Sequence, residues 1–529
     1  MMMKEDTNMK HWKKWSSLAL ALIMSLSLAA CGAPSNESPA PGGSDGPGQS
    51  SEPAGPKTLT VGTMDATDTF DPCSNANCGL GLTMVYDTIL KLNYETMEVE
   101  PSIATSWEWV EDDLLKLTIR DDAVFSNGDP LTPEDVLYSL SRFVFENNQF
   151  DPGYDDIDYD NSYIEGNDLY LKLTTVSADL LYNLSNDRWA SVVNEEYVKA
   201  NPDAWWNAPC GTGPYVCDEN VEGSHSTYTR RDDYWGELPD AETVTIRHYS
   251  EATTMIADFE NGALDIALDV AEADYLAAQD GAYGEVTTKL FPKWDLLAVC
   301  LPEYNPAFDD IRVREAISLA LDTNSIVAAV FGSLGEVADS ILIKGSTYYT
   351  PIGVHEYNPE KARELLAEAG YGDGMEMKVV IPTMPTNDKC ATIVQAMLKE
   401  VGINLSVESY DFATAIPILM ANGTDISIFG TGGGTYLDSQ VLDTIGQNST
   451  NGGARVSDPE FNEHIEAARV AKDEQTRQAE YDAVQQWAFD NYRTLPIGYA
   501  QAVVLYHNNI GNVTGLNARS IDIVAVTVA

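Results

Sequence analysis

Positively charged residues are scarce in this sequence. The 529 residues include 31 Lys and Arg against 82 Asp and Glu, which gives a formal net charge of −51. Nucleic-acid affinity depends on Lys and Arg replacing the counterions of phosphates, and anionic lipid attracts the same residues. The charge balance therefore argues against nucleic-acid binding and indicates an acidic, soluble protein body.

Histidine and cysteine are also sparse, which limits metal and catalytic chemistry. The histidines beyond residue 30 are scattered and form no HExxH or i, i+4 pair: His225, His248, His355, His464 and His507. Residues 42–46 match the GxSxG motif of hydrolase nucleophiles, but the sequence indicates neither the strand that should precede this motif nor the helix that should follow it. We find no constellation of nucleophile, base and metal ligand, and we expect neither an enzyme nor a bound metal or cofactor.

Long apolar runs are confined to the N-terminus. Lysines precede an apolar run from Leu18 to Ala30, which is too short for an ordinary membrane-spanning helix and is typical of a signal peptide over residues 1–30. The run ends in Leu28-Ala29-Ala30-Cys31, which resembles the lipobox of bacterial lipoproteins. This resemblance implies that Cys31 is diacylated and becomes the mature N-terminus, and two acyl chains hold a protein stably on a membrane. No later segment is expected to span a bilayer.

Residues 31–56 form a linker rich in Pro, Gly and Ser that lacks the apolar residues needed for a core. A flexible coil of about 25 residues spans roughly 25–30 Å between its ends. The rest of the chain is long and apolar enough for two or three globular units, since 44% of the residues are hydrophobic.

The body alternates between helix and strand signals. Thr132-Pro133-Glu134-Asp135 is a helix start with a hydroxyl cap, proline at the first position and acids in the first turn. A second helix is expected from Asp309, with an apolar stripe that includes Val313, Ile317 and Leu321. These stripes indicate core packing.

The stretch from 378 to 429 reads strand, helix, strand, helix, strand. The expected ranges are 378–381, 391–401, 403–407, 412–421 and 425–429, with the second helix predicted despite Pro417. This alternation is typical of an α/β protein with a parallel sheet, in which ligands gather beyond the carboxyl ends of the strands.

A glycine-rich segment follows the last of these strands, in IFGTGGGTYLD (428–438). A phosphate-binding loop needs a nearby Lys, but no Lys or Arg occurs from Asp425 to Gly453. The glycines instead indicate close approach of a ligand to bare main chain.

Two cysteine pairs lie close enough in sequence to bridge short loops in an oxidising compartment, although free thiols are the alternative. The candidate pairs are Cys73 with Cys78 and Cys210 with Cys217.

Several motifs in order resemble one family, the oligopeptide, dipeptide and nickel class of bacterial extracellular solute-binding proteins that serve ABC importers. The most specific is FSNGDPLTPEDV (125–136), followed by Ser139, Leu140 and Arg142. The others include Phe70-Asp71-Pro72, PSIA at 101–104, GTGPY at 211–215, DYW at 233–235, RVREAISLALD at 312–322 and NPEKARELL at 358–366.

The resemblance, which spans about residues 58–500, implies a periplasmic-binding-protein-like, two-lobed Venus-flytrap fold with an extra inserted domain. Domain I would comprise residues 57–93, 195–287 and 495–529, domain II residues 94–194, and domain III residues 288–494. The ligand would lie between the lobes, and closure would follow as a population shift.

The resemblance also suggests the residues that line the ligand site. Peptide-binding members usually carry Trp and Asp at the positions of Thr431 and Gly434. The resemblance therefore implies that this part of the ligand site lacks the carboxylate that would bind the α-ammonium group of a free peptide. It also implies that no bulky side chain occupies this part of the site. The candidate ligand-binding residues are Gly81, Leu82, Trp294, Thr431, Gly432, Gly433, Gly434 and Tyr436. Trp205 and Trp206 are expected to be structural, packed beneath a domain crossover.

The function that the resemblance implies is capture of a peptide or peptide-like solute and its delivery to an ABC permease and, through it, to ATPase subunits. The chain would act as a monomer on the outer face of the cell membrane or in the periplasm. The alternatives are a ligand-presenting sensor and a secreted hydrolase. A turnover assay on peptides and esters would separate the hydrolase from a binding protein.

Overall fold

The computed structural model describes residues 56–74, 78–146, 153–176, 179–293, 295–432, 454–471 and 473–529. Residues Gly55–Ala529 belong to one compact unit. Within the described ranges no single helix is long and apolar enough to cross a membrane, and only the bent pair Ile311–Ala320 and Thr323–Leu334 meets that test jointly.

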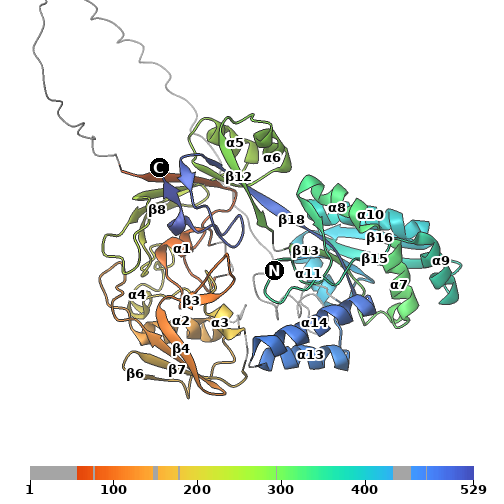
Figure 1. Ribbon diagram of the computed structural model, residues 1–529, viewed down its shortest axis with the longest axis horizontal. Helices are drawn as coiled ribbons and strands as arrows, with labels where there is room; N and C mark the ends of the chain where they lie inside the picture. Colours follow the sequence, from red (N-terminus) through yellow and green to blue (C-terminus); the bar gives the residue numbers. More distant parts are fainter. Residues whose placement is uncertain are drawn as a thin grey trace, which may run out of the picture. The chain divides into compact units, whose positions relative to one another are not determined.

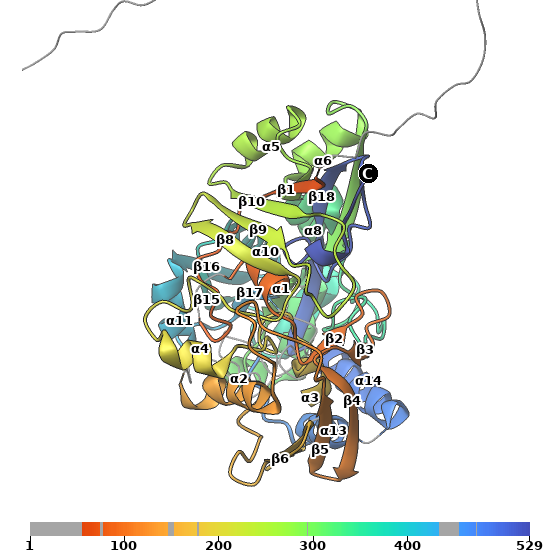
Figure 2. The ribbon, with the colours of Figure 1, turned by 90° about the vertical axis from the view of Figure 1, so that its left-hand side faces the viewer.

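A mixed sheet runs in the order β17-β13-β18-β11-β1-β10-β9-β8, and β12 and β14 also pair with β18. β1 lies parallel to β10 and β11, whereas β18 is antiparallel to β11, β12, β13 and β14. Figure 2 shows β1, β10, β9 and β8 in succession. The bounds are β1 (Thr58–Thr63), β8 (Tyr215–Val221), β9 (His225–Arg230), β10 (Thr243–His248), β11 (Ile266–Val270), β12 (Val286–Pro292), β13 (Asp295–Cys300), β14 (Gly335–Val337), β17 (Ser427–Gly432) and β18 (Thr494–His507).

A second, antiparallel sheet in the order β4-β5-β7-β6 packs with α2 around its own apolar core, which includes Leu117, Leu140 and Leu169. The neighbouring β2 and β3 form a short antiparallel pair. The bounds are β2 (Leu90–Leu92), β3 (Val99–Pro101), β4 (Ala104–Glu111), β5 (Leu114–Ile119), β6 (Tyr163–Glu165), β7 (Asp168–Lys172), α2 (Pro133–Phe145), α3 (Leu180–Asn183) and α4 (Glu195–Ala200).

The predicted start of α2 is confirmed. The Thr132 hydroxyl accepts a hydrogen bond from the Asp135 backbone N–H, and the Asp135 carboxylate accepts one from the Thr132 backbone N–H. This reciprocal capping box satisfies two donors that the first helical turn leaves without helical partners. Asp135 also accepts from the backbone N–H of Glu195, so the cap joins the start of α2 to the start of α4.

Arg142, near the end of α2, connects this helix to two distant segments. Its guanidinium donates to both carboxylate oxygens of Asp71 at 3.0 and 3.2 Å, and it lies 4.6 Å from the Trp205 ring centre. Trp205 is buried, which confirms its predicted structural role. The same prediction is wrong for Trp206, whose side chain is 40% exposed.

The stretch from 375 to 432 folds as the alternation of signals predicts. β15 and β16 are parallel, in register from Met375 opposite Ile403, and a parallel bridge joins Val379 to Ile426 just before β17. The sheet is mixed, however, because β17 pairs antiparallel with β13. Helices accompany these strands in Figure 1. The bounds are η1 (Pro306–Phe308), α7 (Ile311–Ala320), α8 (Thr323–Phe331), η2 (Gly332–Leu334), α9 (Pro359–Glu368), β15 (Met375–Pro382), α10 (Pro385–Glu400), β16 (Ile403–Tyr410), α11 (Phe412–Met420), α13 (Pro459–Val470) and α14 (Glu474–Asn491).

The C-terminal residues return to the core beneath β1 and β10. Val513, Ile521 and Val526 are buried there together with Leu82 and Tyr215. The remaining elements are α1 (Gly81–Val85), α5 (Ala252–Glu260), α6 (Glu272–Gln279), β19 (Ile510–Gly511), η3 (Ile523–Ala525) and β20 (Thr527–Val528).

Candidate functional site

Two of the predicted site segments lie side by side at the end of β17. Gly432 pairs with Asp295 and Thr431 pairs with Leu296, so the glycine-rich segment begins beside the start of β13. The strand thus extends into the glycines, which the sequence placed wholly in a loop. Trp294, Gly433, Gly434 and Tyr436 lie outside the described residues, as does Cys31.

The start of β13 is also a crossing point between two parts of the sheet. β12 pairs with the second half of β18, Pro292 opposite Gln501, and β13 pairs with its first half, Leu297 opposite Gly498. The Lys293 backbone N–H donates to the Ala500 carbonyl oxygen at 3.0 Å between these two ladders. The chain therefore runs on adjacent antiparallel strands at this crossing.

Gly81 and Leu82 occupy a different place, at the start of α1. Both are buried, and a Cβ on Gly81 would lie 2.5 Å from the Tyr228 hydroxyl oxygen and 2.7 Å from a Phe70 ring carbon. Only a residue without a side chain fits against these rings. Any ligand contact at Gly81 would therefore involve its main chain.

Contacts also join the region of β4–β7 to the last helices of the chain. The Arg469 guanidinium of α13 lies 4.0 Å from a carboxylate oxygen of Asp156. Burial, followed by the nearby charge of Glu474 on α14, raises the pKa of Tyr182 on α3. These contacts bring α3 and the loop before β6 against α13 and α14.

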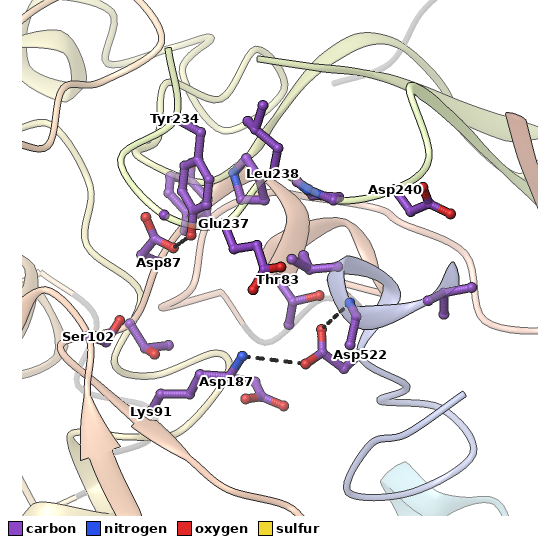
Figure 3. Close-up of a pocket in the computed structure, with 18 of the residues that line it drawn as sticks. Thr83, Asp87, Lys91, Ser102, Asp187, Tyr234, Glu237, Leu238, Asp240 and Asp522 are labelled. Carbon is purple, nitrogen blue, oxygen red and sulfur yellow. Dashed lines mark hydrogen bonds and ion pairs between the residues drawn. The ribbon is translucent and has the colours of Figure 1, made fainter. Parts of the chain in front are cut away.

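A cavity of about 510 Å³ lies elsewhere, against the C-terminal segment. It is lined by parts of residues 83–102, 234–240 and 512–527, together with Asp187 and Pro214. Figure 3 shows Lys91, Asp187 and Asp522 converging on one side and Asp87, Tyr234 and Glu237 on another. The sequence motifs did not reveal this cavity, because the residues that line it lie as far apart in the chain as Thr83 and Thr527.

The carboxylates of this cavity have unusual surroundings. Asp87 accepts hydrogen bonds from the Trp235 indole N–H at 2.7 Å and the Tyr234 hydroxyl at 2.9 Å. Even so, burial raises its pKa. Burial and the charge of Asp522 raise the pKa of Asp187 to about 6, against the lowering effects of the Tyr94 hydroxyl and Lys91. The cavity therefore disfavours the ionised form of Asp187.

The four candidate half-cystines lie in two regions. Cys73 and Cys210 are buried in the core around β5 and α2, and Cys78 is buried in the core beneath β1. Cys217 is partly buried against that second core. Disulfide pairing among them stays a prediction.

Within the described ranges, no group of three or more His, Cys, Asp and Glu side chains is arranged to hold a metal ion. The described residues form an acidic cavity with aromatic walls, and the glycine-rich segment begins beside the crossing of β12, β13 and β18.

Comparison with known proteins identifies the class. The family model of bacterial extracellular solute-binding proteins, family 5 (middle region), matches residues 98–453, and the chain belongs to this family. The probable ABC transporter periplasmic-binding protein SapA of Escherichia coli K12 is 23% identical over 481 residues, which cover 84% of this chain and 87% of SapA.

Solved structures show the same fold. NikA from Brucella suis in complex with Fe(III)-EDTA has a TM-score of 0.79 and 22% identity, covering 89% of this chain and all of NikA. The dipeptide-binding protein of Pseudoalteromonas sp. SM9913 in complex with Met-Leu has a TM-score of 0.72 and 21% identity, with coverage of 89% and 100%. The predicted α/β, two-lobed periplasmic-binding-protein fold is confirmed.

Proposed function

We propose that this protein is the lipid-anchored, extracellular binding component of an ABC importer. It captures a peptide or peptide-like solute between its lobes and delivers it to a membrane permease. The observation that carries the proposal is the crossing of β12–β13 and β18 beside Gly432, which puts a candidate hinge next to the start of the glycine-rich segment. Membership of the solute-binding family supports the same function.

The hinge gives the proposed binding reaction its mechanism. Strands β12 and β13 both pair with β18 at this crossing, and we expect that a change in a few backbone torsions here rotates one lobe against the other. A ligand that touches both lobes favours the closed state by the difference between its affinities for the closed and open states. The permease then recognises the closed state.

The ligand class follows from the composition of the wall. Strand β17 ends with Thr431 and Gly432, Gly433 and Gly434 follow them in the sequence, and none of these four residues carries a carboxylate. A buried α-ammonium without a carboxylate partner costs several kcal/mol. We therefore propose a peptide-like solute whose amino group is blocked, absent or paired with another residue, bound largely through main-chain hydrogen bonds.

The domain division 57–93, 195–287 and 495–529, with 94–194 and 288–494 as the other domains, is part of this proposal. So is diacylation of Cys31 beyond the signal segment 1–30, with residues 31–56 as the tether. Cys31→Ser should release the protein from the membrane fraction and abolish incorporation of labelled palmitate. Retention of the label would contradict anchoring at this residue.

The ligand itself is accessible by experiment. Native mass spectrometry of protein purified without denaturation should show a bound molecule below about 1 kDa, released on unfolding. Returning it to refolded protein should raise the melting temperature, because a ligand held only by the native state stabilises that state.

A glycine variant locates the bound molecule. Gly434→Phe should abolish this temperature rise while leaving the fold intact. Gly372→Phe is a matched control, since Gly372 is an exposed glycine in the turn before β15. An undiminished temperature rise in Gly434→Phe would contradict the proposed wall.

A further inference from the structure

The cavity against the C-terminal segment is separate from the proposed wall of the cleft. Its lining includes Thr83 on α1, Lys91 and Tyr94 around β2, the turn at 234–240 and the chain from Asn512 to Thr527. Gly81, Leu82, Thr431 and Gly432 are not among its lining residues. At about 510 Å³ it lies within the range of small-molecule sites in proteins.

The lining carries more negative charge than its cations balance. Asp240 is paired with Lys57 at 2.7 Å, and Asp87 accepts from the Trp235 and Tyr234 side chains. Asp187, Glu237 and Asp522 then face the cavity with Lys91 as the cation among the lining residues. The charge that remains after these pairings is negative.

Lys91 and Asp187, which both line the cavity, each have few close charged partners. Its ammonium lies 3.4 Å from a carboxylate oxygen of Asp522, a distance at the long end for a charged hydrogen bond. The Asp187 carboxylate accepts a hydrogen bond from the Tyr94 hydroxyl at 2.7 Å to Oδ1. The raised pKa of Asp187 is the expected consequence of a half-enclosed carboxylate that lacks a close cation.

A positively charged group in the cavity would supply the close cation that Asp187 lacks and would add to the single long contact of Asp522 with Lys91. The rest of the lining suits the carbon skeleton of such a ligand, because Leu238, Ile521 and Val524 are apolar and Tyr94 and Tyr234 present aromatic rings. We propose that this cavity is a second ligand site, which binds a small organic cation through an ammonium or guanidinium group at Asp187 and Asp522.

The proposed role of Asp187 predicts an effect on protein stability that would not be expected if its carboxylate served only to stabilise the fold. If Asp187 is retained for binding at the expense of folding, Asp187→Asn should raise the melting temperature of the empty protein at pH 7.5. The same change should lower the affinity for the cation at least tenfold, because it removes the ionic partner.

Agmatine, which carries both an ammonium and a guanidinium group, is the probe, and 1,4-butanediol is its neutral counterpart. Calorimetry on the full-length mature protein at pH 7.5 should show saturable agmatine binding and no binding of the diol. Binding should weaken as the pH falls below about 6, when Asp187, which faces Tyr94, Lys91 and Asp522, takes up a proton.

Matched variants separate this cavity from the cleft. Asp232→Asn is the control, since Asp232 is exposed and does not line the cavity. Glu237→Gln is a second cavity variant that should weaken binding without affecting folding. Loss of agmatine binding in Asp187→Asn and its retention in Asp232→Asn and Gly434→Phe would support the site.

Three outcomes would overturn the proposal: no saturable agmatine binding, equal binding in Asp187→Asn, or loss of binding in Gly434→Phe alone. The last would assign the cation to the cleft and leave the proposed transport function standing.

Discussion

The ion pair between Arg142 and Asp71 offers a test of how the family motifs stabilise the fold. Arg142 is 6% exposed and Asp71 22% exposed, and their side chains share two hydrogen bonds. Arg142→Met keeps the length of the side chain but removes both bonds, the bond to Glu146 at 2.9 Å and the cation against Trp205.

The expected loss of stability follows from burial. Removing one partner of a fully buried ion pair costs about 3–5 kcal/mol. Asp71 retains partial access to water and still accepts from the Cys73 backbone N–H, so we expect roughly 2–4 kcal/mol for Arg142→Met. The double variant with Asp71→Asn should recover part of the loss, with a coupling of about 1–3 kcal/mol.

The assay is equilibrium urea unfolding followed by the emission of the chain's tryptophans, which include Trp205 beside Arg142. Arg312→Met is the control, because Arg312 forms an exposed pair with Asp310 and should leave the unfolding midpoint unchanged. If Arg142→Met were as mild as Arg312→Met, the pair would not hold α2 to the segment around residue 71, and this reasoning would be wrong.

Two further predictions concern other buried groups. His355 stacks on Phe489 with 3.9 Å between the ring centres, and burial lowers its pKa to about 4. Below pH 6.5 the unfolded chain therefore binds a proton at this histidine that the folded chain does not bind. The free energy of unfolding consequently falls as the pH drops towards 4. His355→Phe should make the unfolding free energy less dependent on pH, by roughly 1–2 kcal/mol at pH 5, and an unchanged pH profile would contradict this. Gly498→Ala places a Cβ 2.4 Å from a Val327 methyl carbon and 2.6 Å from the Glu336 carbonyl oxygen. It should destabilise the protein by about 1–3 kcal/mol in the same urea assay, and a neutral effect would show that β18 shifts freely at the crossing.

Local signals predicted the helices and strands well where the pattern was complete. Thr132 and Asp135 cap α2 because both capping side chains lie three residues apart in the sequence. The helix over 412–420 forms despite Pro417, since Asp411 caps its start and the ring falls in a short helix that ends at Met420. Information of this kind is contained within one turn of the chain.

The pairing of strands that lie far apart in the chain could not be predicted from local sequence signals. The alternation from 378 to 429 predicted parallel neighbours but gave no sign that β13, more than 120 residues earlier, pairs antiparallel with β17. Trp205 and Trp206 look equivalent in sequence, yet one is buried and the other is 40% exposed. The contact of Arg142 on α2 with the Trp205 ring comes from a distant part of the sequence and has no counterpart in the local pattern.

The cavity illustrates the same limit for function. Asp187 and Asp522 lie 335 positions apart, in stretches with no recognisable site motif, and Lys91 comes from a third segment. Only the fold brings these charges together. The candidate ligand-binding segment at Thr431 and Gly432 could be picked out from the sequence because its glycines are consecutive. Its part in ligand binding stays a prediction.

The central claim is that the two lobes close on a ligand about the crossing of β12–β13 and β18. Small-angle X-ray scattering of the mature protein, stripped of ligand by unfolding and refolding and then reloaded with its co-purifying molecule, tests this directly. The account predicts a smaller radius of gyration in the loaded state. An unchanged radius of gyration at concentrations where calorimetry shows saturation would contradict it.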